Sequence, residues 1–188
     1  RLPRFAYLEP NSLPEALTLL AGHERVAVKA GGTDLLPRMK SRLLLPQALI
    51  NLTPLKDLDF IRLDHEGNLV IGALTPLSRI ESSPILRDHF EPLAGAVAQI
   101  GSPELRNMGT LGGNICLDTR CQYYNQSPLF RKGADPCLKT GGARCYISKK
   151  ANQCHALFCA DAVPLLTACG AKIKIVSLAG ESLVSLED

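Results

Sequence analysis

The N-terminal part of the chain shows two patterns of hydrophobic and polar positions, one typical of a helix and one typical of a strand. Ser12 and Glu15 stand three residues apart in front of apolar residues at helical spacing. This is a capping-box pattern, and it predicts a helix over residues 13–21. The run 25–29 is rich in β-branched residues and has no helical spacing, so it predicts a strand.

Next, a glycine turn separates that strand from a second apolar segment. Gly31 and Gly32 end the strand, and Asp34 introduces apolar residues at helical spacing. Another extended run follows over 48–52. The order strand, helix, strand predicts a βαβ unit with parallel strands that ends near residue 53.

The middle of the chain predicts a hairpin followed by helices. Two extended runs, 60–63 and 69–72, flank a Gly-Asn pair that suits a tight reversal. Helices are expected over 76–82 and 92–100, ahead of a glycine-rich segment at 101–114.

The last third contains one long segment without an apolar period, 117–155, which predicts an irregular functional loop. Asp161 is expected to cap a helix that stops at Gly170, and 171–176 alternates as a strand. The residues after Gly180 are expected to begin an element that has no partner in the chain.

Composition narrows the class of protein. The chain has 188 residues, of which 46% are hydrophobic and 21% charged, which excludes collagen, coiled coil and general disorder. The net charge of +3 is scattered along the chain, so a nucleic-acid binder is not expected. No apolar run is long enough to cross a bilayer, and the start has no signal-peptide pattern. We therefore expect a soluble, cytoplasmic protein without membrane contact, whose start has been trimmed or which is a fragment.

Two glycine loops are candidate phosphate sites. Gly31 and Gly32 directly follow a strand, where backbone amides can approach a ligand, and the following helix N-terminus favours an anion. The segment 109–114 is expected to be a second loop of free amides, with the Thr110 hydroxyl and the Asn114 amide available. The spacing matches neither the Rossmann nor the Walker pattern. Two such loops predict an extended, phosphorylated cofactor such as a dinucleotide, with two unrelated structural turns as the alternative that the pattern leaves open.

The seven cysteines form the third candidate site. Their odd number argues against a closed disulfide framework, and no Cys-x-x-Cys pair occurs. Four of them are separated by 16, 8 and 9 positions: Cys121, Cys137, Cys145 and Cys154. Four thiolates could hold a [4Fe-4S] cluster, but spacing alone leaves a zinc ion and unligated thiols open.

The sequences Ala-Gly-Gly-Thr-Asp-Leu-Leu-Pro at 30–37 and Thr-Leu-Gly-Gly-Asn-Ile at 110–115 resemble the two FAD-binding loops of a known family. This is the family of medium, flavin-binding subunits of xanthine dehydrogenase, carbon monoxide dehydrogenase and other molybdenum hydroxylases. Asp161, three residues before Pro164, matches the segment that follows the second loop. The cysteine loop is similar to the inserted loop of the β subunit of 4-hydroxybenzoyl-CoA reductase.

The resemblance implies an α+β fold, a two-lobed FAD-binding domain of the vanillyl-alcohol-oxidase-like type with a cysteine-rich inserted loop. Residues 1–53 would form an N-terminal α/β lobe and 54–188 a second α+β lobe. The second lobe would contain 117–157 as an inserted iron-sulfur loop, and the family's C-terminal domain would be absent from the sequence.

The resemblance also implies the cofactors, FAD and a [4Fe-4S] cluster, and the residues that hold them. The cluster ligands would be the four cysteines of the loop. The implied FAD-binding residues are Lys29, Ala30, Gly31, Gly32, Thr33, Asp34, Leu35, Gly109, Thr110, Gly112, Gly113, Asn114 and Asp161.

The implied function is electron transfer in an oxidoreductase, without a catalytic residue on this chain. A large partner subunit with the molybdenum cofactor would dehydroxylate an aromatic acyl-CoA, and a small subunit would carry [2Fe-2S] clusters. A ferredoxin-type protein would donate electrons. Two alternatives stay open: a zinc-stabilised protein-binding module, and a stand-alone FAD oxidoreductase.

Overall fold

The computed structural model describes residues 1–187, which form two compact units. The core unit contains Arg4–Thr33, Pro46–Cys116 and 160–187. The cysteine unit contains Arg1–Pro3, Asp34–Leu45 and Leu117–Cys159. Both the parallel sheet and the antiparallel hairpins lie in the core unit, in agreement with the predicted α+β class.

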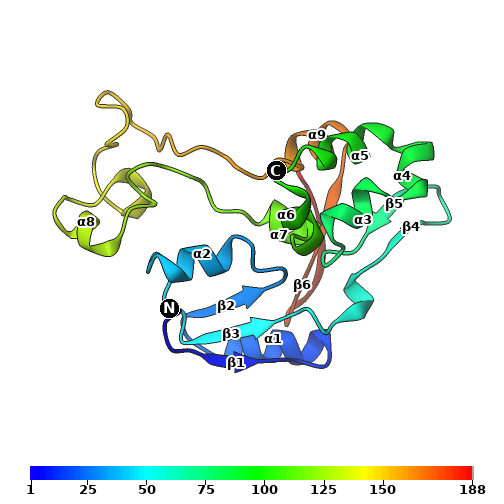
Figure 1. Ribbon diagram of the computed structural model, residues 1–188, viewed down its shortest axis with the longest axis horizontal. Helices are drawn as coiled ribbons and strands as arrows, with labels where there is room; N and C mark the ends of the chain where they lie inside the picture. The colour runs from blue at the N-terminus through cyan, green and yellow to red at the C-terminus, as the bar shows by residue number, and fades with distance from the viewer. Residues whose placement is uncertain (188) are drawn as a thin grey trace. The chain divides into compact units, whose positions relative to one another are not determined.

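A three-stranded parallel sheet begins the core unit, with the strand order β1-β3-β2. Its elements are β1 (Ala6–Leu8), α1 (Leu13–Gly22), β2 (Val26–Lys29) and β3 (Ala48–Asn51). Every residue of β3 is buried, because β3 is the central strand and α1 packs against it (Figure 1). The predicted parallel pairing is confirmed, with Val26 opposite Ala48. The short edge strand β1 has no clear alternation and is missed by the sequence reading.

The capping box of α1 is confirmed in part. The Ser12 side chain accepts a hydrogen bond from the Glu15 amide at 3.3 Å. The Glu15 carboxylate, however, accepts from the backbone amide of Asn11 at 2.7 Å, one residue earlier than the pattern predicts. Both contacts satisfy amides at the start of the helix.

The main hydrophobic core is helical. It is formed mainly by α3 (Leu77–Glu81), α4 (Pro84–His89), α5 (Glu91–Ala98), α7 (Leu111–Ile115) and α9 (Val163–Ala168). The side chains of Ile80, Leu86 and Val97 are fully buried there. A further helix, α6 (Pro103–Met108), precedes α7 in the glycine-rich segment. Its Arg106 is buried and pairs with Glu81 of α3 at 2.7 Å, which fixes α6 against α3.

The predicted hairpin is confirmed as β4 (Ile61–Leu63) and β5 (Leu69–Ile71), which follow the short 3₁₀ helix η1 (Lys56–Leu58). Gly67 takes a φ of +81°, which a glycine adopts without strain. The Asp64 carboxylate accepts hydrogen bonds from the amides of Glu66 and Asn68. These side-chain and backbone contacts build the reversal.

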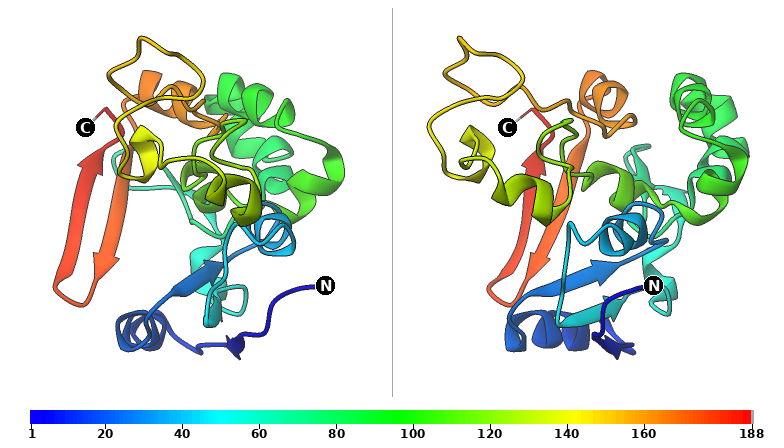
Figure 2. Two further views of the ribbon diagram at one scale, coloured as in Figure 1. Left: turned by 90° about the vertical axis from the view of Figure 1, so that its left-hand side faces the viewer. Right: turned by 60° about the vertical axis from the view of Figure 1, so that its left-hand side comes forward.

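The end of the described chain differs from the prediction. We expected the residues after Gly180 to lack a partner, but β7 (Gly180–Ser185) pairs antiparallel with β6 (Lys172–Ser177) (Figure 2). A tight turn makes this possible, because Gly180 adopts a φ of +128° and the Ser177 hydroxyl donates to its carbonyl. The expectation was therefore wrong.

The prediction for α9 is half right. Gly170 lies in the left-handed region, with φ +65°, just after the helix, as expected of a stop residue. Asp161 does not cap the helix, because the residue at the capping position is Ala162 and it makes no side-chain cap. Pro164 lies in the first turn, where its missing amide costs nothing.

The cysteine unit contains little regular structure. Its elements are α2 (Leu35–Lys40), α8 (Pro128–Lys132) and the 3₁₀ helix η2 (Leu138–Thr140). Tyr123 stacks on Tyr146 with ring centroids 4.1 Å apart, and its hydroxyl donates to the Asp135 carbonyl at 2.9 Å. The predicted absence of a sustained apolar element over 117–155 is consistent with this.

None of the helices between residues 1 and 187 has the length and apolar character that a membrane crossing requires.

Candidate functional site

The first glycine loop lies in the core unit from Ala30 to Thr33. Its carbonyl at Ala30 accepts from the Lys29 ammonium at 2.9 Å, and the same ammonium donates to the Asn51 side chain at 3.0 Å. Over residues 1–187, the amides of Gly31, Gly32 and Thr33 have no acceptor within the chain. Three adjacent amides without partners are suited to an anionic group such as a diphosphate.

The second loop, from Gly109 to Asn114, differs from the prediction of free amides. The amide of Leu111 donates to Thr75 and that of Gly112 to Ala73, at 3.0 and 2.9 Å. The amides of Gly109, Gly113 and Asn114 also have acceptors inside the loop or the preceding helix. The prediction of free amides is wrong because the loop packs against residues 73–75 and also begins the short helix α7, and both arrangements use its amides.

The two side chains expected to be available in this loop are also engaged. The buried Thr110 hydroxyl accepts from the Gly113 amide at 3.1 Å and so caps α7. The buried Asn114 side chain accepts from the Ala162 amide at 3.0 Å. Asn114 therefore ties the second loop to the start of α9, beside the exposed Asp161.

The reason for a glycine at position 31 is a backbone contact within the chain. A Cβ at this position would lie 1.7 Å from the carbonyl oxygen of Met108, directly before the second loop. Only glycine allows this approach. The two glycine loops thus touch through their backbones, and Gly109 lies near the Thr33 hydroxyl.

A cavity of about 200 Å³ opens beside this contact. It is lined by both loops and by polar side chains that follow β3 and lie on α6; these side chains are Thr53, Lys56, Asp59 and Asn107. The sequence reading missed them because they lie outside the two motifs and come from separate segments. Unpartnered amides, a cationic side chain and a cavity together fit part of a phosphorylated cofactor such as FAD.

The remaining residues of the first motif belong to the cysteine unit. Leu35 begins α2, and the Asp34 carboxylate pairs with Arg120 and, at 3.7 Å, with Arg38. Both partners of Asp34 are guanidinium groups. The role of Asp34 in binding FAD stays a prediction, as do those of Lys29, Leu35 and Asp161.

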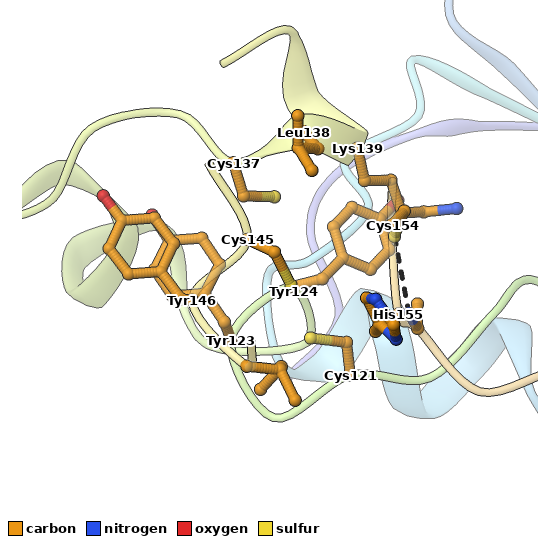
Figure 3. Close-up of a pocket in the computed structure, with 12 residues that line it drawn as sticks. Cys121, Tyr123, Tyr124, Cys137, Leu138, Lys139, Cys145, Tyr146, Cys154 and His155 are labelled. Atoms are coloured by element: carbon orange, nitrogen blue, oxygen red, sulfur yellow. Dashed lines mark hydrogen bonds between the residues drawn. The ribbon is translucent and has the colours of Figure 1, made fainter. Parts of the chain in front are cut away.

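Four cysteines lie around one pocket of the cysteine unit, although they are far apart in the sequence. Cys121, Cys137, Cys145 and Cys154 all line it, and Figure 3 shows their side chains around a common space. The pocket is small, about 20 Å³. No disulfide links any of the seven cysteines. These are the four cysteines that the resemblance implies as cluster ligands.

Hydrogen bonds favour the thiolate form at two of these cysteines. Burial raises the pKa of Cys137, but hydrogen bonds from the Thr140 side chain and nearby backbone amides outweigh this and bring the pKa below its usual value. Backbone amides of Ser148 and Ile147 lower the pKa of Cys145. The Cys154 sulfur also accepts from an amide, that of Ala156 at 3.4 Å. Thiolates are the form that binds metals.

A polar network lies beside the cysteine pocket and centres on Asp118. Its carboxylate contacts the Lys139 ammonium at 2.9 Å, the Arg38 guanidinium at 2.9 Å and the Tyr124 hydroxyl at 3.0 Å. Burial raises the pKa of Asp118, but the bonds from Lys139 and Tyr124 outweigh it, so the pKa lies below its usual value. The hydrogen bond between Lys139 and Asp118 also raises the pKa of Lys139. Sequence reasoning did not single out Asp118 or Lys139 because no motif marks them.

The donor set of the pocket fits an iron-sulfur cluster in kind and number, since four thiolates are its usual ligands. The cysteine side chains do not, however, adopt a metal-binding arrangement in this structure. Across residues 1–187, no three His, Cys, Asp or Glu side chains are arranged to hold a metal ion.

Comparison with known proteins gives the family. The family model described as "FAD binding domain in molybdopterin dehydrogenase" matches residues 3–188. The chain therefore belongs to this family of FAD-binding domains, as the two loop motifs suggested.

Comparison with individual proteins points to the same family. The chain is 41% identical over 113 residues to the nicotinate dehydrogenase FAD-subunit of Eubacterium barkeri, covering 59% of this chain and 38% of that protein. It is 41% identical over 114 residues to the carbon monoxide dehydrogenase medium chain of Hydrogenophaga pseudoflava, covering 60% and 39%.

Solved structures extend the likeness to the whole chain. Carbon monoxide dehydrogenase from Hydrogenophaga pseudoflava superposes with a TM-score of 0.74 at 28% identity, covering 100% of this chain and 52% of that one. Quinoline 2-oxidoreductase from Pseudomonas putida 86 gives 0.73 at 26%, covering 100% and 52%. The chain thus spans between about two fifths and half of the length of these relatives.

Proposed function

We propose that this chain is the flavin-binding, electron-transfer part of a molybdenum-containing oxidoreductase. The substrate site would lie on a large partner subunit with the molybdenum cofactor, and a small partner would carry [2Fe-2S] clusters. Membership of the FAD-binding family supports the flavin. The names of two relatives, a FAD-subunit and a medium chain, support a multi-subunit assembly.

In this proposal, the amides of Gly31, Gly32 and Thr33 donate to the FAD diphosphate. The second loop serves mainly as a support: Thr110 and Asn114 hold it in place, and its backbone fixes the first loop at Gly31. When bound, FAD exchanges one or two electrons and a [4Fe-4S] cluster exchanges one, so together they can join carriers of different electron number.

We propose further that Cys121, Cys137, Cys145 and Cys154 hold a [4Fe-4S] cluster. The observation that carries this proposal is that these four cysteines, spread over 34 residues, line a single pocket. Backbone hydrogen bonds to sulfur, which also tune the potential of such clusters, supply a second argument.

The proposed reaction of the whole assembly is that of a 4-hydroxybenzoyl-CoA reductase. Removal of the ring hydroxyl as water consumes two electrons and two protons, and the electrons would pass through this chain. The similarity of the cysteine loop supports this substrate class, whereas relatives are named for nicotinate, caffeine and carbon monoxide. Assays of the assembled enzyme with 4-hydroxybenzoyl-CoA, nicotinate and carbon monoxide distinguish these cases. Turnover of either of the last two alone would overturn the assignment.

A ferredoxin-type protein is the proposed electron donor. Residues 117–159 carry seven Lys or Arg and only two Asp, and they contain no Glu. Exposed apolar side chains accompany this charge, with Leu129 82% and Phe130 57% exposed. A basic segment with exposed apolar side chains is suited to docking an acidic redox protein. Reduction by such a donor should slow steeply as salt is added; a rate independent of salt would contradict this docking.

We also propose that residues 1–53 and 54–188 are the two lobes of the FAD domain, with 117–157 inserted in the second. In support, all strands of the parallel sheet precede residue 53, and the helical core follows it.

The decisive experiment is anaerobic purification with analysis of iron, sulfide, zinc and acid-released flavin. The proposal expects FAD, and about four irons per chain as a [4Fe-4S] cluster requires. Cys137→Ser should lose the iron and keep the flavin. The matched control is Cys169→Ser, an exposed cysteine of the core unit, which should keep both.

The other outcomes each overturn part of the proposal. Zinc without flavin would favour a zinc-stabilised binding module. Flavin without iron would leave the flavin function and remove the cluster, and turnover of a substrate by this chain alone would favour a stand-alone flavoenzyme.

A further inference from the structure

The wall of the cysteine pocket contains a charged side chain, Lys139, that has no role in the proposed function so far. Lys139 and Tyr124 both line the cysteine pocket. The Lys139 ammonium lies 4.9 Å from the centre of the Tyr124 ring, and the Tyr124 hydroxyl donates to Asp118. Lys139 is thus held by the Tyr124 ring, which Figure 3 shows with it in the pocket wall, and by the Asp118 carboxylate.

Asp118 fixes this cation and partly offsets its charge. Its carboxylate contacts Lys139 and Arg38, both at 2.9 Å, and accepts from the Thr119 amide at 2.8 Å. Asp118 itself is not part of the pocket wall, whereas Lys139 is. Of the two members of the pair, Lys139 is therefore the one that borders the cysteines.

The network around the pair extends to α2. It contains three cations, Arg38, Arg120 and Lys139, and two carboxylates, Asp34 and Asp118. The side chains of Arg38, Asp118 and Lys139 are 17%, 29% and 25% exposed. Partial burial limits screening by solvent, so these charges act on the pocket more strongly than fully exposed ones would.

We propose that the Lys139–Asp118 pair sets the reduction potential of the cluster held by the four cysteines. This inference rests on the proposed function. Reduction adds one negative charge to a cluster that four thiolates already make anionic, and a fixed cation nearby favours the reduced state. Lys139 supplies that cation, and Asp118 positions it and limits its effect. Lys139 acts through its charge, Asp118 is the positioning residue, and neither is a cluster ligand.

Substitution of the two members should shift the midpoint potential in opposite directions. A purely structural role does not predict opposite shifts. Lys139→Met removes the cation while keeping an unbranched side chain, so the midpoint potential should fall. Asp118→Asn leaves the cation without its counter-charge, so the potential should rise. Lys139→Arg should stay close to the unaltered protein. The control is Lys149→Met, an exposed lysine of the same unit that should cause no shift.

The measurement is a redox titration of the anaerobically purified full-length protein, followed by the electron paramagnetic resonance signal of the reduced cluster. Iron and flavin content are measured on the same samples. Opposite shifts of Lys139→Met and Asp118→Asn at full iron content support the inference.

Two results overturn it. Unchanged potentials in both variants would mean that the pair does not act on the cluster. Loss of iron from Lys139→Met and also from the milder Lys139→Gln would mean that the pair is only structural. Either result leaves the proposed function intact, whereas an unaltered protein without iron removes the cluster itself. The two failures are therefore distinguishable.

Discussion

The two units of this chain are stabilised by different forces. In the core unit, the helices bury a continuous set of aliphatic side chains, and every residue of the central strand β3 is buried as well. In the cysteine unit, the buried hydrophobic residues over 1–187 are limited to Met39, Tyr123 and Cys137. That unit instead contains five of the nine ion pairs found in the described chain.

The difference indicates how far the stability of each unit depends on a bound cofactor. Burial of apolar surface stabilises the core unit whether or not a ligand is bound. Partly exposed ion pairs contribute only about 0–1 kcal/mol each, so under the proposed function the cysteine unit would depend more on the cluster that its thiols hold. Each of the following variants tests this contrast, from the largest expected effect to the smallest.

The largest effect is expected from the core. Ile80 is fully buried, and Ile80→Ala should lower the free energy of unfolding by about 2–5 kcal/mol because it leaves a cavity. Leu129→Ala, at an 82% exposed position of the cysteine unit, should change it by less than about 0.5 kcal/mol. Urea unfolding followed by circular dichroism measures both. Equal losses would contradict the contrast.

A second variant tests the contact between the glycine loops. Gly31→Ala places a Cβ 1.7 Å from the Met108 carbonyl, and the required backbone shift should cost about 1–3 kcal/mol and weaken FAD binding. Gly22→Ala is the control, since no atom lies within 4 Å of a Cβ there. Flavin fluorescence titration measures the affinity. Unchanged FAD affinity in Gly31→Ala would show that the loop contact does not shape the site.

The matching variant in the cysteine unit is Gly142→Ala. Its Cβ would lie 1.6 Å from the Pro136 carbonyl, next to Cys137, so we expect loss of iron with FAD retained. Gly133→Ala should keep both, because its nearest neighbour is the Phe130 carbonyl at 3.6 Å. Iron and flavin analysis of the purified variants gives the answer. Loss of FAD together with iron would show that the two units do not respond independently.

The smallest effect concerns the exposed turn of the core unit. Hydrogen bonds from the Asn68 side chain and backbone hold the pKa of Asp64 below its usual value. The charged form is therefore favoured in the fold, and its stabilisation is present at neutral pH and lost as the pH falls through this pKa. Asp64→Asn should be slightly less stable at neutral pH and indistinguishable in acid. Urea midpoints compared across this range test it; an equal difference at every pH would contradict it.

The fold was predictable where local signals were strong. The capping residues of α1, the β-branched strand β2 and the Gly-Asn reversal each have a local physical cause, and all three are present. The hairpin β6–β7 was missed because its pairing depends on a turn at Gly180 that the sequence reading did not anticipate. The edge strand β1 was missed because three residues carry too little pattern.

The candidate site was predictable in part. The sequence correctly indicated the family through its two glycine loops, and it marked the four cysteines that line one pocket. It assigned free amides to both loops, but most of those in the second donate to residues 73–75 or within α6 and α7. An amide's partner depends on which segments fold beside it, and the motif alone does not contain this information.

The sequence by itself determined which chemical groups this protein has available: glycines that let backbones approach, and thiols in the number a cluster needs. Only the tertiary structure decided how they are used. Gly31 makes room for the Met108 carbonyl, and Lys139 at the cysteine pocket pairs with Asp118. Contacts between residues distant in sequence have no local signature, since they arise only when packing brings the segments together.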